Sequence, residues 1–506
     1  MNKSLAHLFQ IKYLILLLII IAAFLRLYNF PNTLMFQGDQ GRDAILVARI
    51  WREHDPVFIG PVMSVGNLYL GPLYYYFMLP FLFVTYPSPL GPAVAVAILG
   101  TMSVGLIYYL GKKLVGETAA FFASFFLTFS YVAVEYSRFS WNPNPAPFVS
   151  ILLIYFTYKA WTKNVWYWLL VSVCVSVLIQ LHYVTLLSAV GAGLIWLIQL
   201  ATFVKNKEQR TKNKNFNKFV ICTFLSLIIF LLSLTPLVLF DFKHNYVNAY
   251  ALQSMFTKED ALEQKGGLLA TLKETHGRGM HILYEATIGQ VRQLNSSLYW
   301  LSLISLAILL AKAKGGQDER EFQALVVIVS FLLTGILGTA IYQHTVFNHY
   351  ILYLLPITFL IYGIFAARLW RSSLGKLLVI IFIIVFLQFN LIRLPLKSLG
   401  WTIKNVSEVA QEILTHVDEN EQYNVILLSE SKDLYAQNYR YYLEASQHQP
   451  LGLDEYALAD KLIVINESQP GVDVAALPIY EIVTFPRDQV ETFPQENGPD
   501  LVIFSR

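Results

Sequence analysis

Acidic and basic side chains meet in the segment Gly-Asp-Gln-Gly-Arg-Asp at 38–43, which lies between an apolar run and the amphipathic stretch 44–51. A positioned carboxylate can accept the proton of an attacking hydroxyl, and general-base catalysis of this kind contributes about 10²–10⁴ in rate. We therefore take Asp39 as the candidate base. On a helix that begins near position 41, Asp43 is offset from Asp39 by about one turn, so the two carboxylates can share a face, bind a cation together or pair with Arg42.

The same spacing also has a purely structural interpretation. Asp39 can cap the N-terminus of the helix, which needs no ligand. Asp43 can pair with Arg42 or Arg49 as solvated loop charges, whose net contribution is small. Spacing alone leaves both interpretations open.

A second polar segment at 137–145, Ser-Arg-Phe-Ser-Trp-Asn-Pro-Asn-Pro, puts one guanidinium and two amides beside an aromatic ring. Arg138 can clamp a phosphate with two parallel hydrogen bonds, and Asn142 or Asn144 can hydrogen-bond to a sugar. The alternative is a stiff proline turn with a snorkelling arginine and an interfacial tryptophan.

Histidines and tyrosines at the boundaries of apolar runs form a third group of candidates. His182 and His349 can assist a phosphate leaving group or bind a divalent cation. No His-x-x-x-His or paired-carboxylate spacing supports a metal site, so metal dependence stays unknown and a structural role is the alternative. Tyr74 can line a groove for a sugar or a prenyl chain, although tyrosine is also enriched at bilayer interfaces without any ligand.

These candidates require a membrane scaffold. Of 506 residues, 56% are hydrophobic and 14% are charged, whereas soluble proteins are roughly half apolar and a quarter charged. The apolar residues cluster in long runs. The length of these runs is close to the roughly twenty residues that a helix needs to cross the hydrocarbon core of a membrane. The net charge of +3 is small, and the basic residues sit in short loops, which indicates membrane orientation and excludes a nucleic-acid partner.

Charged or proline-rich breaks divide the chain into about eleven predicted transmembrane helices. They lie near 12–29, 90–111, 117–136, 146–161, 165–181, 183–204, 218–240, 297–313, 322–342, 349–369 and 375–393. The apolar stretch 68–86 is interrupted by glycine and prolines. We interpret it as re-entrant or interfacial, because counting it as a span would put the N-terminal lysines opposite every later basic loop.

This assignment predicts a multi-pass protein of the cell (inner) membrane with a cytoplasmic N-terminus. The first outer loop is then 30–90 and the long outer loop is 241–296, with shorter outer segments at 137–145 and 342–348. Residues 1–393 form the transmembrane domain. The change to a mixed polar pattern after Arg393 predicts a small extracytoplasmic α/β domain over 394–506.

Within that domain, Asn405 and Glu408 have the spacing of a helix capping box. Apolar strings predict strands at 424–428, 461–465, 479–484 and 501–504, and a helix between 433 and 445.

The order of these motifs resembles the GT-C glycosyltransferases, in the branch of the protein O-mannosyltransferases, aminoarabinose transferases and Rgt-like enzymes. The resemblance rests on a transmembrane helix followed by an acidic loop with a short helix. It continues with Gly-Pro-Leu-Tyr-Tyr-Tyr at 71–76, Tyr-Leu-Gly-Lys-Lys-Leu at 109–114 and Tyr-Ile-Leu-Tyr-Leu-Leu-Pro at 350–356. The later spans match mainly by topology.

The resemblance implies an enzyme that moves a hexosyl or pentosyl group from a polyprenyl-phosphate sugar to a cell-envelope glycan, lipid or protein by inverting displacement. It implies that the family's catalytic aspartate is Asp39. The chain departs from the family at Gln40, where glutamate is common, and at Gly71, where a lysine often precedes the proline. The remaining candidates for substrate binding are Arg42, Asp43, Tyr74, Arg138, Asn142, Asn144, His182, His349 and Tyr350.

The main alternative is a transporter or flippase of lipid-linked glycans. Transporters usually carry ionisable groups at mid-membrane, where these groups mark the pathway. In this sequence the notable charges cluster at one predicted surface, which favours surface chemistry.

Overall fold

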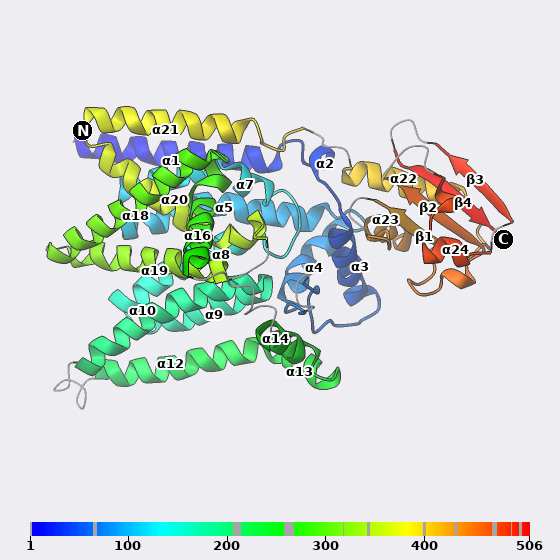
Figure 1. Cartoon of the computed structure of the whole chain (residues 1–506), viewed down its shortest axis with the longest axis horizontal. Coiled ribbons are helices and arrows are strands. Elements are labelled where there is room, and N and C mark those ends of the chain that lie inside the picture. Colours follow the sequence, from blue (N-terminus) through cyan, green and yellow to red (C-terminus); the bar gives the residue numbers. More distant parts are fainter. Residues whose placement is uncertain are drawn as a thin grey trace.

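The computed structural model describes residues 3–63, 68–205, 214–257, 268–316, 318–341, 345–397, 401–429, 433–467, 473–486, 488–494 and 498–506. A bundle of long helices forms most of the molecule, and a small mixed sheet lies beyond one end of it (Figure 1). The N-terminus lies at the opposite end of the bundle from this sheet.

A helix lies at each of the predicted spans. These helices are α1 (Lys3–Leu27), α5 (Leu90–Val115), α6 (Glu117–Phe129), α8 (Ala146–Thr162), α9 (Tyr167–Leu181), α10 (Leu186–Lys205), α12 (Lys214–Ser233), α18 (Arg292–Gly315), α19 (Glu319–Ile341), α20 (Leu355–Leu369) and α21 (Ser373–Leu391). Among the described residues, 7 helices are long and apolar enough to cross a membrane by themselves, while α6 and α9 are shorter apolar helices. The predicted polytopic helical fold is confirmed.

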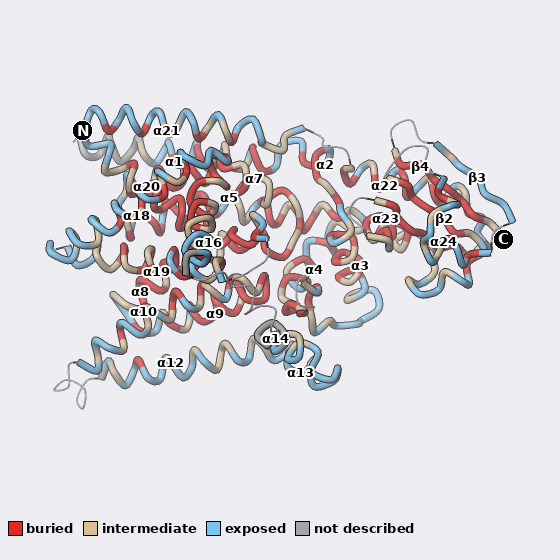
Figure 2. Tube along the Cα trace, in the orientation of Figure 1, coloured by how far each residue is buried: buried red, intermediate tan, exposed pale blue. Residues whose placement is uncertain are grey.

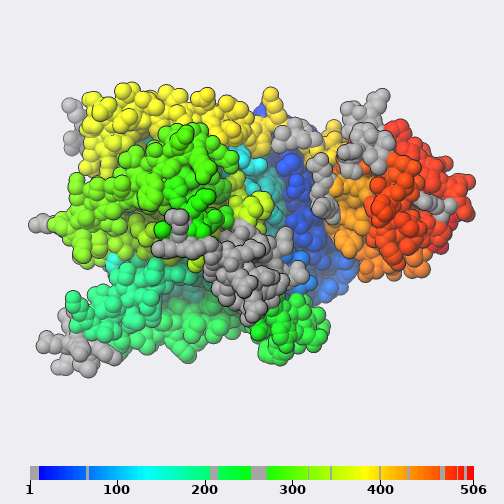
Figure 3. Space-filling view, in the orientation of Figure 1, coloured from blue at the N-terminus to red at the C-terminus, as the bar shows by residue number. Residues whose placement is uncertain are grey.

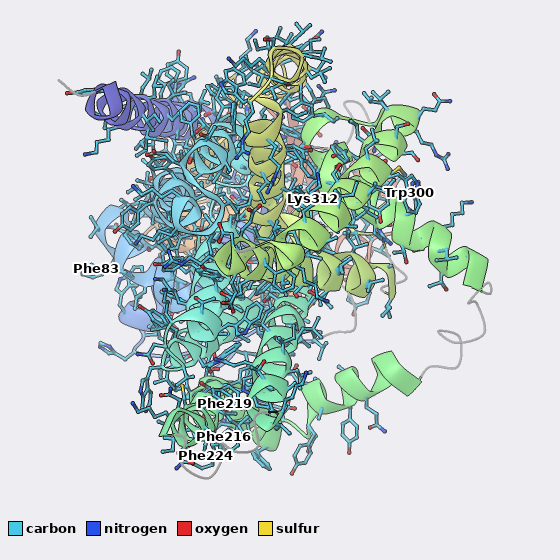
Figure 4. All side chains as sticks on the ribbon, turned by 90° about the vertical axis from the view of Figure 1, so that its left-hand side faces the viewer. Phe83, Phe216, Phe219, Phe224, Trp300 and Lys312 are labelled. Atoms are coloured by element: carbon cyan, nitrogen blue, oxygen red, sulfur yellow. The ribbon has the colours of Figure 1, made fainter. Side chains whose placement is uncertain are left out.

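Apolar side chains cover the outside of the bundle as well as its inside. The helices α12 and α21 are largely exposed, whereas α20 is buried among its neighbours (Figure 2). Phe83, Phe224 and Trp300 are exposed and lie on different sides of the bundle (Figure 4). Exposed apolar surface of this extent is typical of contact with lipid.

The short elements of the predicted first outer loop lie at the end of the bundle that faces the sheet (Figure 1). They are α2 (Phe30–Thr33), α3 (Gly38–Arg52) and α4 (Leu73–Thr85). With 13 residues, α4 is as short as α6, and both are shorter than the roughly twenty residues needed to cross hydrocarbon; that 68–86 does not span stays a prediction.

The predicted long outer loop contributes further elements, although its residues 258–267 lie outside the described part of the chain. Here α13 (Thr235–Lys243) and α14 (Val247–Thr257) lie near the same end as α3 and α4. The helix α16 (Leu268–Met280) runs across the bundle and continues into a π-helical turn at His281–Glu285 and a short α17 (Ala286–Ile288).

Several lysines gather at one end of the bundle. Lys205, Lys312 and Lys376 lie near the ends of α10, α18 and α21 at the end of the bundle that carries the N-terminus. Because cytoplasmic loops collect lysine and arginine, this distribution supports the predicted orientation. A cytoplasmic N-terminus stays a prediction.

The C-terminal domain contains a four-stranded sheet of order β1-β2-β4-β3, in which only the first pair is parallel among the described strands. Its elements are α22 (Ile403–Thr415), β1 (Tyr423–Leu428), α23 (Gln437–Glu444), β2 (Lys461–Asn466), α24 (Tyr480–Thr484), β3 (Gln489–Phe493) and β4 (Asp500–Ser505). Alternate residues of the central strands face two separate cores. One core contains residues of the C-terminal domain alone. The other includes residues of α22 and α23 and is continuous with the apolar core of the helical bundle.

The helix predicted between 433 and 445 is α23, which begins at Gln437 after Ala436 in the left-handed conformation. Two other details of this domain differ from the sequence prediction. The apolar string 479–484 forms a helix, α24, in which only Ile482 is buried, and the fourth strand is instead β3. No apolar pattern marks β3, because it is an edge strand with four of its five residues exposed. The capping box involves Thr402 and Asn405, because α22 begins at Ile403, and Glu408 instead pairs with Lys404.

Candidate functional site

The helix α3 holds Asp39 in its first turn, at the end of the bundle that faces the C-terminal domain. The residue in the N-cap position is Gln37, and it makes no side-chain capping bond. Asp39 is 54% exposed. The carboxylate is therefore open to an incoming group and is not the cap of the helix.

Arg42 joins the two acidic residues of this segment. Its Nη1 lies 2.7 Å from Asp39 Oδ1, and its Nη2 lies 2.8 Å from Asp43 Oδ1. The predicted cluster of Asp39, Arg42 and Asp43 is present in the structure. Arg49 belongs to a different contact, because it pairs with Glu53 and with Glu444 of the C-terminal domain.

Asp43 is almost fully buried, with 1% of its side chain exposed. Tyr75 donates its hydroxyl hydrogen to Asp43 Oδ1 over 3.0 Å, and the buried Oδ2 has no hydrogen-bond partner in the structure. Burial raises the pKa of Asp43 to about 6, opposed by the positive charge of Arg42 and assisted by the negative charge of Asp39. Asp43 thus titrates near neutral pH. It is in contact with Arg42, the cation that also pairs with the candidate base Asp39.

The C-terminal domain covers α3 from the side away from the bundle. Figure 3 shows the first-loop segment, in blue, between the bundle and the orange start of this domain. A Cβ atom added to Gly41 would lie 2.3 Å from the backbone oxygen of Gln437 and 2.5 Å from the backbone nitrogen of Asn438. Only glycine allows the two backbones to approach this closely. The start of α23 is therefore seated directly on the helix that carries Asp39.

Further hydrogen bonds hold the domain in this place. The amide of Ile403 donates to Leu34 O over 2.9 Å, and the Nδ2 of Asn438 donates to Phe36 O over 3.2 Å. The ring of Phe36 packs edge-on against Tyr441 and Tyr442. The loop that carries α2, α3 and α4 and the C-terminal domain thus form one continuous structure around α3.

Tyr74 lies deeper than the sequence suggested. Its hydroxyl is 2.7 Å from Ser140 Oγ, and the side chain is buried. Ser140 also contributes to a small, mostly apolar pocket between the first loop and α4 and α5; its lining includes Gln40, Ala44 and Met78. The free space inside this pocket is about that of one water molecule.

The side chain of Arg138 makes structural contacts within the protein. It donates to Leu25 O over 2.8 Å, to Tyr28 O over 2.9 Å and to Thr33 Oγ1, and only 4% of it is exposed. Its guanidinium also lies 5.2 Å from the centre of the Phe30 ring. Arg138 therefore ties the end of α1 to α2, and the two Nη atoms that a phosphate clamp would use are bonded to protein acceptors.

We expect Arg138→Met to lower the stability of the detergent-solubilised protein by about 2–5 kcal/mol, because buried acceptors would lose charged donors. Thermal unfolding measures the effect. Arg371→Met, at an exposed position near the other end of the bundle, is the control. If the Arg138 variant is as stable as the control but loses phosphate binding, the clamp interpretation is right.

The two asparagines of the 137–145 segment are both buried. Asn144 donates its Nδ2 hydrogen to Phe139 O over 2.8 Å, while Asn142 Oδ1 and Asn144 Oδ1 are buried without a hydrogen-bond partner. Asn144 and Arg26 contribute to the lining of a second small pocket inside the bundle. Neither asparagine reaches the surface beside Asp39 in this conformation.

The structure brings His182, His349 and Tyr350 together from separate segments. The ring centres of His182 and His349 are 5.9 Å apart, and Tyr350 lies 4.7 Å from the first and 4.4 Å from the second. His182 Nδ1 accepts the Val184 amide hydrogen, which leaves Nε2 as the protonated nitrogen of the neutral ring. Within the described ranges, no three His, Cys, Asp or Glu side chains are grouped to hold a metal ion.

The missing lysine at position 71 has a steric explanation. A Cβ atom on Gly71 would lie 2.4 Å from Gln180 Oε1 and 2.5 Å from Gln180 Cγ. Gln180 is buried and donates to Ser233 O over 3.3 Å. The glutamine therefore occupies the space into which a side chain at 71 would have to grow.

The tyrosines at 74–76 were expected to line a groove, and the sequence analysis missed the hydrogen bond of Tyr75 to Asp43 and the contribution of α23. One signal was available for α23, because Gly38 and Gly41 lie three residues apart on a short helix and so mark a close approach of another backbone. No local signal pointed to Gln437 and Asn438 as the partner, since about three quarters of the chain separates them from α3.

The helical bundle, the first-loop helix and the covering α/β domain together have the fold of the GT-C glycosyltransferases. ArnT from Cupriavidus metallidurans in the apo state aligns with 99% of this chain and 98% of its own, at 10% identity and a TM-score of 0.57. The same protein bound to undecaprenyl phosphate aligns over the same shares at 11% identity, with a TM-score of 0.55. The predicted resemblance is confirmed at the level of the fold.

Two other comparisons agree with this assignment. An oligosaccharyltransferase from Archaeoglobus fulgidus, in complex with Zn and sulfate, aligns with 89% of this chain and 68% of its own, at 13% identity and a TM-score of 0.52. The pattern of the dolichyl-phosphate-mannose-protein mannosyltransferase family matches residues 71–234. No curated protein matches the sequence significantly.

Proposed function

We propose that the protein is a membrane glycosyltransferase that moves a sugar from a polyprenyl-phosphate donor to a hydroxylated acceptor of the cell envelope. The observation that carries the proposal is the position of Asp39. Its exposed carboxylate is paired with Arg42 on α3, the helix that the C-terminal domain covers. The fold supports it, because ArnT shares this architecture and binds undecaprenyl phosphate. The match to a mannosyltransferase family over 71–234 supports the same reaction class.

In the proposed reaction, Asp39 accepts the proton of the acceptor hydroxyl as the hydroxyl oxygen attacks the anomeric carbon. The bond between that carbon and the phosphate oxygen breaks on the opposite face, so a single displacement inverts the anomeric configuration. The polyprenyl phosphate leaves with the bonding electron pair. Cationic or hydrogen-bonding groups beside it would stabilise the developing charge.

Arg42 and the histidine group are our candidates for contact with the phosphate. Arg42 keeps 28% of its side chain exposed, whereas Arg138 has its donors committed to Leu25, Tyr28 and Thr33. His182 and His349 lie together near the outer ends of their helices.

We expect kcat/KM to fall as the pH decreases through about 6, the value to which burial raises the pKa of Asp43. Below that pH, Asp43 binds a proton and loses its charge, so the positive charge of Arg42 acts on Asp39 alone and makes it a poorer proton acceptor. Asp43→Asn should have low activity at neutral pH and should lack this acidic limb. A pH profile of both proteins measures the effect, and an unchanged limb in the variant would contradict it.

A flippase of lipid-linked glycans is distinguished by the fate of the donor. The purified protein is reconstituted in liposomes that contain polyprenyl-phosphate sugars extracted from the source membranes, and acceptor-containing membranes are added. A transferase releases free polyprenyl phosphate, because it breaks the bond to the sugar. A flippase moves the intact lipid between leaflets without releasing polyprenyl phosphate, and that result would refute the proposal.

A further inference from the structure

Three lysines gather where the helices α5 and α8 end. Lys112 and Lys113 occupy the last turn of α5, and Lys159 occupies the last turn of α8. The helix α5 begins next to α4, at the end of the bundle that faces the sheet, and its 26 residues are long enough to cross hydrocarbon. The lysines therefore lie at the opposite end of the bundle from the candidate site around Asp39.

Tyrosine rings hold the three ammonium groups close together. Lys113 Nζ lies 4.3 Å from the centre of the Tyr109 ring and 5.6 Å from the centre of the Tyr155 ring. Lys159 Nζ lies 5.4 Å from the same Tyr155 ring, so this ring joins the ends of two helices. Lys112 Nζ lies 5.8 Å from the Tyr109 ring. An aromatic ring attracts and orients a cation, but it does not neutralise the charge of that cation.

The positive charge of this lysine cluster is not balanced by the protein. None of the three lysines forms an ion pair with a carboxylate in the part of the chain that the structure describes. The carboxylate of Glu117, at the start of α6, instead accepts the hydroxyl hydrogen of Tyr108 over 2.8 Å. The C-terminal ends of two helices contribute about half a negative charge each. Even with these ends and Glu117 counted, positive charge is in excess, so the cluster attracts an anion.

An apolar stripe on α5 leads to this cluster along the outside of the bundle. Ile98, Met102 and Tyr109 are exposed, and their spacings of four and eleven residues place them on one face of the helix. Lys113 follows Tyr109 by four residues and continues this face. A lipid whose acyl chain lies along the stripe would place its phosphate beside Lys113. A free phosphate ion would make no use of the stripe.

We propose that Lys112, Lys113 and Lys159 bind the headgroup of an anionic phospholipid, whose acyl chain lies along the exposed face of α5. Tyr109 then lies at the boundary between headgroup and chain, where tyrosine is enriched in membrane proteins. A zwitterionic lipid fits less well, because its headgroup brings a second positive charge to the lysines. The site is separate from the glycosyltransferase function proposed above and does not depend on it.

The test compares two double variants of the purified full-length protein. The first combines Lys113→Gln with Lys159→Gln. The matched control combines Lys312→Gln with Lys314→Gln, which removes two exposed lysines from the last turn of α18. Thermal unfolding in a neutral detergent is followed as phosphatidylglycerol, phosphatidylcholine or inorganic phosphate is added in increasing amounts. Native mass spectrometry of the same samples identifies the lipid that stays bound.

We expect phosphatidylglycerol to stabilise the wild type and the α18 control at much lower concentrations than phosphatidylcholine does. The variant of Lys113 and Lys159 should need about thirtyfold more phosphatidylglycerol for half of the stabilisation, because each lysine near an anionic lipid contributes a factor of about five. Mass spectrometry should find bound phosphatidylglycerol on the wild type and the control, and much less of it on this variant. Titration of each protein from its own lipid-free unfolding temperature separates lipid binding from a change in stability.

Equal phosphatidylglycerol requirements of the two double variants would overturn the assignment to this cluster. Stabilisation of the wild type by phosphatidylcholine at the same concentrations would show that the charge of the headgroup is not recognised, and would overturn it as well. If inorganic phosphate stabilises the wild type as phosphatidylglycerol does, and the first double variant loses that effect, the ligand is a free anion and the lipid proposal is wrong.

Discussion

Asp39→Asn is expected to lower transferase activity by about 10²–10⁴-fold, because asparagine cannot accept the proton of the attacking hydroxyl. The fold should not change, since the side chain is 54% exposed and its contact is the ion pair with Arg42, which contributes little to stability at an exposed site. Release of polyprenyl phosphate in liposomes measures the activity. Thermal unfolding in detergent checks that stability is retained.

Asp55→Asn is the matched control for this variant. Asp55 is an exposed aspartate of the same loop, beyond the end of α3. It should keep wild-type activity, so that an effect at position 39 cannot be ascribed to the charge of the loop in general. Full activity of the Asp39 variant would exclude that residue as the base.

Gly41→Ala is expected to move the C-terminal domain away from α3 and to reduce activity by about a hundredfold, because a misplacement of about 1 Å near a reacting centre has effects of this size. The added methyl carbon would lie 2.3 Å from the backbone oxygen of Gln437. A backbone atom cannot move aside as a flexible side chain can. Limited proteolysis between the bundle and the domain, together with the activity assay, measures the displacement.

Gly193→Ala provides the control for helix propensity. Gly193 lies in α10, and a Cβ atom added there has nothing within 4 Å. Because alanine is favoured over glycine inside a helix by about 1 kcal/mol, this variant should be as stable as the wild type or more so. If Gly41→Ala behaves like Gly193→Ala, the contact between α3 and α23 is not as close as described.

The sequence predicted the transmembrane helices because lipid leaves the backbone no alternative. A chain in hydrocarbon must satisfy its own hydrogen bonds, so each long apolar run becomes a helix whatever its partners are. The cluster of Asp39, Arg42 and Asp43 was also predictable, since residues three and four apart share a helix face. Both features depend only on local sequence.

The parts that could not be predicted depend on distant partners. Arg138 has suitable chemistry for a phosphate, but its acceptors Leu25 and Tyr28 lie more than a hundred residues earlier in the chain. The edge strand β3 carries no apolar pattern, because four of its residues face solvent. The contact of Asn438 with Phe36 joins residues 402 positions apart, and no local pattern encodes it.

The lipid that co-purifies with the Asp39→Asn protein tests the account most directly. If the exposed carboxylate is the base for sugar transfer, the variant binds its donor but cannot use it, and mass spectrometry should find a polyprenyl-phosphate sugar with the sugar still attached. The wild-type protein should carry mainly polyprenyl phosphate from which the sugar has been released. Recovery of sugar-free polyprenyl phosphate from both proteins alike, or of no prenyl lipid from either, would contradict the account.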